Sequence, residues 1–146
     1  MEGNIISMLT PHYVAYLDIM GFSRLVSADD NLAKYEKAIE LLEYFNIIKK
    51  ALEESSNDSH IVKVTAFSDN IVISVPITGK YSEYLDYLCT AHLCTTLCRF
   101  ITNTGYVMRG GISKGDFYHT DSILFGKALV DAYEYEKIAN YPRIIT

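Results

Sequence analysis

Two short runs rich in β-branched residues, at positions 61–67 and 70–75, are separated only by Ser68 and Asp69. A connection of two residues can join antiparallel strands, whereas parallel strands need a crossover of about a dozen residues or more. The pattern therefore predicts a tight hairpin in the middle of the chain. A hairpin at this point requires a sheet that is at least partly antiparallel.

The segments around this hairpin alternate between strand-like and helical patterns. Strand-like runs occupy residues 12–19 and 106–118, a short helix is expected at 22–26, and a last helix at 126–139 precedes a further strand-like run at 141–146. Residues 81–102 are expected to be helical, with Gly105 at the C-terminal cap. Gly110 and Gly111, inside the run at 106–118, indicate close approach of another backbone or a ligand.

A long helix is also expected from about residue 32 to residue 54, because apolar residues recur there at helical spacing with charged residues between them. Such a helix would lie on the surface with one face on the core. The apolar residues predicted to form that face are Leu32, Tyr35, Ile39, Leu42, Phe45 and Leu52.

The order of these elements predicts an α+β fold of the ferredoxin-like kind, a mostly antiparallel sheet with helices packed on one face. With 146 residues, 49% of them hydrophobic, the chain can bury one core, so we expect a single domain over residues 1–146. The last strand-like run stops with the chain, so we expect this domain to be C-terminally truncated within a strand.

The charge and the hydropathy pattern exclude several classes of protein. The net charge of −5 argues against a nucleic-acid-binding surface, which would need clustered Lys and Arg. No apolar run approaches the roughly 20 residues that span a bilayer, and the N-terminus lacks the pattern of a signal peptide. We therefore expect a cytoplasmic protein with no nucleic-acid partner and no direct insertion into a membrane.

Two aspartates occupy positions where a core strand would not favour them: Asp18 near the end of the first strand and Asp69 in the hairpin turn. In the predicted topology these two positions can be neighbours. Adjacent carboxylates repel and raise each other's pKa unless a hard divalent cation lies between them. Such an ion, also bound by triphosphate oxygens, would polarise the α-phosphate and activate an attacking hydroxyl. Taken singly, Asp18 could instead cap the following helix, and Asp69 could be an ordinary turn residue.

Three segments together resemble the class III nucleotide cyclases, in the order and spacing of that family: YLDIMGFSRLV, AFSDNIVISVP and RGGISKGDFYHTDSILFGKALVDAYEYE. The likeness is strongest to the pyrimidine cyclases of bacterial Pycsar antiphage systems, because of FSDNIVIS, the doubled glycine of RGGIS, and FGKALVDAYEYE followed by YPRI. The resemblance implies a cyclase catalytic core that converts a nucleoside triphosphate into a 3',5'-cyclic monophosphate and pyrophosphate. The product would be cyclic UMP or cyclic CMP, acting as an antiphage second messenger.

The resemblance also implies roles for residues around the two aspartates. Asp18 and Asp69 would bind Mg2+ or Mn2+, with the Ile19 carbonyl as a further ligand. Arg109 could reach phosphate or support the site, although a strand arginine paired with a surface acid is an equal alternative.

The turn after the first strand would contact the phosphates. By resemblance, Gly21, Phe22 and Ser23 would place backbone N–H groups at a helix N-terminus against the triphosphate.

The base-reading positions of the family depart from the purine type. They are occupied by Thr65 and Ile123, and neither side chain offers purine-type hydrogen bonds, so UTP or CTP is the favoured substrate. The positions that carry a transition-state Asn and Arg in many members hold Val130 and Glu134. Either the stabilising cation comes from elsewhere, with Lys114, Lys127 and Arg143 as candidates, or the chain is a weak enzyme.

The family's active sites lie between two chains, and this chain has one set of motifs. The resemblance therefore implies a head-to-tail homodimer with shared active sites and a downstream effector that senses the cyclic nucleotide. The alternative is a catalytically silent cyclase-homology module that binds a nucleotide or a partner for regulation.

Overall fold

A computed structural model describes residues 5–26, 32–54, 61–79 and 82–146 of the chain. Every helix and strand expected from the sequence is present within a few residues, and the short elements η1 and β5 are additional. The elements in chain order are the 3-10 helix η1 (Ile5–Met8), β1 (Thr10–Ile19), α1 (Phe22–Val26), α2 (Leu32–Glu54), β2 (Lys63–Phe67), β3 (Asn70–Pro76), α3 (Glu83–Asn103), β4 (Met108–His119), β5 (Leu124–Phe125), α4 (Lys127–Ile138) and β6 (Ile144–Ile145).

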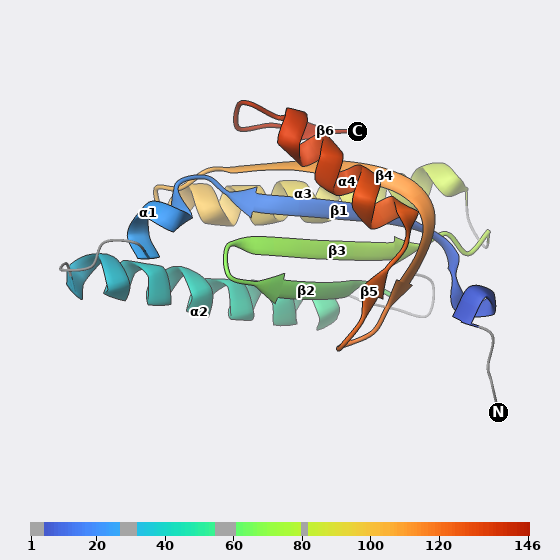
Figure 1. The fold of residues 1–146 in the computed structure, drawn as a ribbon, viewed down its shortest axis with the longest axis horizontal. Helices are drawn as coiled ribbons and strands as arrows, with labels where there is room; N and C mark the ends of the chain where they lie inside the picture. Colours follow the sequence, from blue (N-terminus) through green and yellow to red (C-terminus); the bar gives the residue numbers. More distant parts are fainter. Residues whose placement is uncertain (1–4, 27–31, 55–60, 80–81) are drawn as a thin grey trace.

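The strands form one sheet in the order β2-β3-β1-β4-β5, and β6 pairs with β4 (Figure 1). The pairs β1–β3, β1–β4, β2–β3 and β4–β5 are antiparallel, whereas β6 runs parallel to β4. The central order β2-β3-β1-β4 is the one that two β-α-β units produce when each crossover is right-handed. The predicted α+β, mostly antiparallel fold is therefore confirmed.

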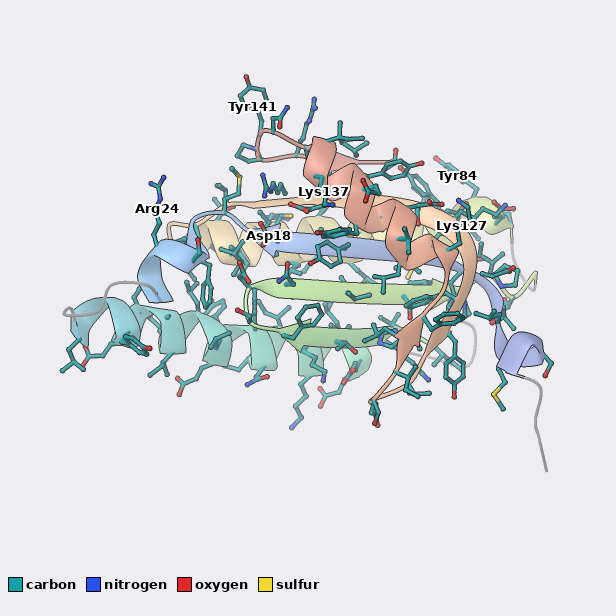
Figure 2. The ribbon with its side chains drawn as sticks, viewed as in Figure 1. Asp18, Arg24, Tyr84, Lys127, Lys137 and Tyr141 are labelled. Carbon is teal, nitrogen blue, oxygen red and sulfur yellow. The ribbon has the colours of Figure 1, made fainter. Side chains whose placement is uncertain are left out.

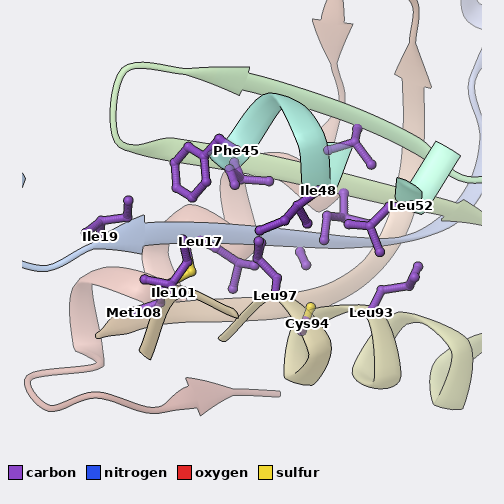
Figure 3. Close-up of a cluster of buried hydrophobic side chains, with 14 of the residues drawn as sticks. Leu17, Ile19, Phe45, Ile48, Leu52, Leu93, Cys94, Leu97, Ile101 and Met108 are labelled. Atoms are coloured by element: carbon purple, nitrogen blue, oxygen red, sulfur yellow. The ribbon is translucent and has the colours of Figure 1, made fainter. Parts of the chain in front are cut away.

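The main core lies between one face of the sheet and the helices α2 and α3. Alternate residues of β1, namely Ala15, Leu17 and Ile19, point into it and are at most 1% exposed. Phe45 of α2 and Leu97 of α3 close over them from the helical side (Figure 3). The two long helices thus cover the same face, as the sequence predicts.

The buried face of α2 differs from the prediction. Phe45 and Leu52 are buried as expected, but Leu32, Tyr35, Ile39 and Leu42 are exposed. The apolar residues of this helix form two stripes, and the helical spacing in the sequence does not distinguish one stripe from the other. Packing against the sheet selects only one of these stripes, which consists of Ala38, Leu41, Phe45, Ile48 and Leu52.

Helix α4 crosses the opposite face of the sheet, in front of β1 and β4 in Figure 1. It lies close to the sheet because small residues meet there: a Cβ at Gly111 would overlap the carbonyl oxygen of Ala132 and the Cβ of Tyr135. At Gly110 the space for a Cβ is taken by Leu17 and the Tyr16 carbonyl. The expected close approach of another backbone at the doubled glycine is confirmed.

The distal half of β4 and the short β5 form an arm that curls over the same face as α4 (Figure 1). The Lys63 ammonium on β2 donates a hydrogen bond of 2.7 Å to the carbonyl of His119, at the end of β4. This contact joins the last residue of β4 to the strand at the far edge of the sheet. Within the described residues, no helix is both long and apolar enough to cross a membrane.

Candidate active site

The two aspartates predicted to be neighbours do lie together. Asp18 is the penultimate residue of β1 and pairs with Asn70, the first residue of β3. The Ile19 N–H donates to the Asp69 carbonyl oxygen at 3.0 Å, which fixes the hairpin turn beside the end of β1. Ser68 accommodates the tight turn with a positive φ of 53°. Asp18 and Asp69 therefore share one end of the sheet.

The electrostatics of this pair leave it short of positive charge. Burial, together with the charge and hydrogen bond of the neighbouring Asp69, raises the pKa of Asp18 to about 7. Glu136 raises that pKa further, and Arg109 lowers it. A cation between the two carboxylates would relieve their repulsion.

Arg109 bridges the acidic pair and helix α4. Its Nε lies 2.5 Å from Glu136 Oε1 and 3.5 Å from Asp18 Oδ2. Glu136 is 4% exposed, so the arginine pairs with a buried acid rather than a surface one. The sequence did not identify Glu136, although it follows Ala128 and Ala132 at intervals of four residues on the inner face of α4. A charged residue on a face of small buried residues indicates a buried partner.

A series of side-chain contacts connects Asp69 with the solvent-exposed side of α4. Asn70 donates to Asp69 at 3.2 Å and accepts a hydrogen bond from the Tyr16 hydroxyl at 2.8 Å. The Tyr133 ring packs edge-on against Tyr16, and the Lys137 ammonium lies 4.2 Å from the centroid of the Tyr133 ring. Figure 2 shows Asp18 at the end of β1 and Lys137 on α4, which crosses it. Lys137 was not among the cations considered from the sequence.

The three side chains that the sequence offered as the stabilising cation are paired with other groups. Lys114 pairs with Glu83 at 2.5 Å, Lys127 pairs with Asp131 on the same helix, and Arg143 donates to the Ile138 carbonyl at 3.5 Å. The positions of the family's Asn and Arg are also unsuited to a phosphate group: Val130 is 58% exposed, and Glu134 lies 3.5 Å from Lys137.

The turn between β1 and α1 has the backbone form that the sequence suggests. Gly21 has a φ of +83°, and its carbonyl accepts from the Arg24 N–H at 3.2 Å. The Phe22 side chain is buried in the core, whereas Ser23 is exposed. A phosphate contact at Phe22 would therefore use the backbone, because its ring holds α1 against the core.

Thr65 is engaged by a residue that the sequence did not identify. Its hydroxyl lies 2.7 Å from Nε2 of His119, whose Nδ1 lies 2.6 Å from the Ser74 hydroxyl. Burial, reinforced by the positive charge of Lys63, lowers the pKa of His119 to about 4. The neutral imidazole thus connects β2, β3 and the arm of β4 and β5.

Ile123 lies on the same arm, in the turn before β5, and is 54% exposed. Beside Tyr16, between this arm, α4 and the sheet, is a hollow of about 410 Å³. Its lining consists of Tyr16, Phe67, Val72, Leu124, Leu129, Val130 and Tyr133. Ile123 and Thr65 are not part of this lining, so the two predicted base-reading residues do not converge on one described cavity.

The donor set fits a magnesium-type ion better than an all-protein metal site. Among the described residues, no group of three or more His, Cys, Asp and Glu side chains could by itself hold a metal ion. Magnesium is commonly bound by one or two carboxylates, and water and substrate phosphates complete the coordination. The close pair of Asp18 and Asp69 matches that pattern.

Comparison with known proteins identifies the fold. No protein-family model and no curated protein matches this chain. A solved structure, the adenylyl cyclase CyaB from P. aeruginosa, superposes with a TM-score of 0.70 at 14% sequence identity. The match covers 94% of this chain and 77% of that one. The protein therefore has a nucleotide-cyclase-like fold.

Proposed function

We propose that this protein is a metal-dependent nucleotide cyclase. The observation that carries the proposal is the carboxylate pair of Asp18 and Asp69, at one end of the sheet of a cyclase-like fold, with the pKa of Asp18 raised to about 7. A pair with this electrostatics binds Mg2+ or Mn2+ in exchange for its proton, with the Ile19 carbonyl as a third oxygen ligand. The bound ions would polarise the α-phosphate and lower the pKa of the attacking ribose hydroxyl.

The remaining groups of the site hold and orient this pair. Asn70 and Tyr16 fix the Asp69 carboxylate, and Glu136 holds Arg109 beside Asp18. Arg109 supports the site from there. The backbone at Gly21, Phe22 and Ser23 binds the triphosphate.

The proposed substrate is a pyrimidine triphosphate, UTP or CTP, and the product is an antiphage second messenger made in the cytoplasm. Support comes from Thr65 and Ile123, which replace purine-reading side chains. Thr65 already shares its hydroxyl with His119 at 2.7 Å, which limits the hydrogen bonds it can offer to a base. A downstream effector that senses the cyclic nucleotide completes the proposed system.

The proposed active form is a homodimer with shared sites. The face that carries the acidic pair also exposes Phe67, Ile123, Phe125 and Val130, which are 49 to 58% exposed. Contiguous apolar surface of this kind is typical of an interface. We propose Lys137 as the transition-state cation, because its contacts through Tyr133, Tyr16 and Asn70 lead to Asp69. Its own ion pair, with Glu134 at 3.5 Å, is longer than the ion pairs of Lys114 and Lys127.

One observation favours a second candidate function. Val130 and Glu134 cannot supply the donors that stabilise transition-state charge in related enzymes, and the loss of one such donor costs on the order of 10² to 10³ in rate. A catalytically silent module would keep the fold and bind a nucleotide or a partner without turnover.

The test is incubation of the purified chain with ATP, GTP, CTP or UTP and Mn2+, with cyclic monophosphates measured by mass spectrometry. A cyclic pyrimidine product that Asp69→Ala abolishes and Asp116→Ala retains would establish the function. Asp116 is the matched control because it is exposed and pairs with Pro11 at the far end of β1. Nucleotide binding without product from any triphosphate would instead establish the silent module.

Thermal unfolding tests the metal site separately. Because a proton competes with the cation at the pair, Mn2+ should raise the melting temperature more at pH 8 than at pH 6, the two sides of the Asp18 pKa of about 7. Asp69→Ala should remove this effect. A shift that is equal at both pH values would contradict the assignment of the metal to this pair.

A further inference from the structure

Helix α2 has a second apolar stripe that nothing in the described part of the chain covers. Leu32, Tyr35, Ile39 and Leu42 are 77%, 49%, 52% and 36% exposed. Their spacing of three, four and three residues places them on one face of the helix. Single exposed apolar residues are common, but a row of four large ones marks a contact surface.

A row of glutamates borders this stripe. Glu36, Glu40 and Glu43 are exposed and follow one another at intervals of four and three residues, so they line the side of the stripe that faces away from the core. Lys37 lies beyond that row and pairs with Glu40 at 3.2 Å. The row beside the stripe is thus acidic, which gives the face a negative edge, and Lys49 and Lys50 follow on the same helix about two turns after it.

We propose that this stripe is a docking face for an amphipathic helix of a partner protein that carries basic side chains along the edge of its apolar face. Helices that bind in this way place apolar side chains at intervals of three and four residues against such a surface. Lys or Arg on the partner would lie opposite the glutamate row and would set its orientation. The inference does not depend on the proposed enzymatic function.

The charge pattern disfavours a second copy of this chain as the occupant. Antiparallel two-fold pairing of the same face would bring one glutamate row towards the other, and in any pairing each chain has a net charge of −5. The stripe lies on the N-terminal half of α2, beside α1 and on the opposite side of the sheet from α4 (Figure 1). A partner could therefore dock here without covering the acidic pair.

The test uses a synthetic amphipathic peptide of about 18 residues, or five helical turns, with leucines at helical spacing and lysines along one edge. A matched peptide carries glutamates in place of the lysines. Binding of each fluorescent peptide to the full chain is measured by anisotropy. The basic peptide should bind at least about tenfold more tightly than the acidic one. Salt should reduce the difference, because ions in solution screen the attraction between exposed charges.

Two variants of α2 locate the binding face. Ile39→Ser, within the stripe, should weaken binding of the basic peptide by about tenfold or more, since it removes an apolar contact. Ile138→Ser is the matched control: this residue is 58% exposed at the end of α4, on the opposite side of the sheet. Glu36→Lys should reduce the ratio of the affinities for the basic and the acidic peptide. Circular dichroism checks that each variant is folded.

Several outcomes would overturn the proposal. Equal affinity for the two peptides would exclude charge recognition, and an equal effect of Ile39→Ser and Ile138→Ser would exclude the stripe. Concentration-dependent dimerisation in sedimentation velocity that Ile39→Ser abolishes would assign the face to a second copy of the chain.

Discussion

Strand β1 presents different chemistry to the two sides of the sheet. Towards α2 and α3 it places Ala15, Leu17 and Ile19, which are almost fully buried in the main apolar cluster. Towards α4 it places Tyr16 and Asp18, which are partly exposed and belong to a polar network. Because successive side chains of a strand point to opposite faces, one strand can contribute to the stable core and to the reactive site at once.

The two faces also differ in the chemistry of their hollows. The groove between α2 and α3, of about 380 Å³, is lined mainly by apolar side chains, whereas the hollow of about 410 Å³ between α4, the arm and the sheet borders Tyr16 of the polar network. A polar site needs such an opening beside it, since buried carboxylates without a cation are unfavourable. The comparison predicts that substitutions on the first face change stability, and that those on the second change pH response and activity.

The largest effect on stability is expected from Leu17→Ala. Leu17 has 0% exposure, and truncation of a buried leucine leaves a cavity that lowers the free energy of unfolding by about 3 kcal/mol. Tyr16→Phe, one residue away on the other face, should cost less than about 1 kcal/mol, because it removes a single hydrogen bond. Urea denaturation of both variants measures the difference. Equal destabilisation would mean that the two faces are not energetically distinct.

The next effect concerns His119 and the stability of the arm at low pH. The pKa of His119 is about 4 in the folded protein and about 6.5 when unfolded, so between these values the unfolded chain binds more protons. Its contribution to stability is therefore lost as the pH falls from about 6.5 to about 4. Asp18 acts in the opposite direction, because its raised pKa stabilises the folded state as the pH falls through about 7.

Comparison with His119→Gln isolates the histidine, since the Asp18 contribution is common to both proteins. Free energies of unfolding at pH 7.5 and pH 4.5 should fall more in the wild type than in the variant. Parallel changes in the two proteins would show that His119 is not held neutral by the fold.

The smallest effect is expected on catalysis at Lys137, if the chain has the proposed activity. Lys137→Met should lower kcat by about tenfold, or about 1.4 kcal/mol, because it removes the cation that we propose for the transition state. Lys137→Arg should retain most of the rate, and Lys127→Met serves as the control because that lysine pairs with Asp131. Pyrophosphate release measures all three. A rate in Lys137→Met equal to that of the control would remove Lys137 from the site.

The neighbourhood of Asp18 and Asp69 could be predicted because local signals defined it. A polar residue near the end of an apolar strand and a two-residue turn are both visible in the sequence, and the fold order brings them together. Glu136, His119 and Lys137 could not be placed in this way. The contacts of His119 with Thr65 and Ser74 span 54 and 45 residues of sequence, so only the curl of the β4 arm creates them.

The sequence by itself determined the order of helices and strands, the antiparallel hairpin and the position of the two aspartates, because periodicity and turn chemistry act over a few residues. The tertiary structure alone decided which apolar stripe of α2 is buried, since both stripes satisfy the same helical spacing. It also decided that Arg109 pairs with Glu136, and that His119 lies between Thr65 and Ser74. These outcomes depend on how separate elements pack, and packing is a property of the whole chain rather than of any local pattern.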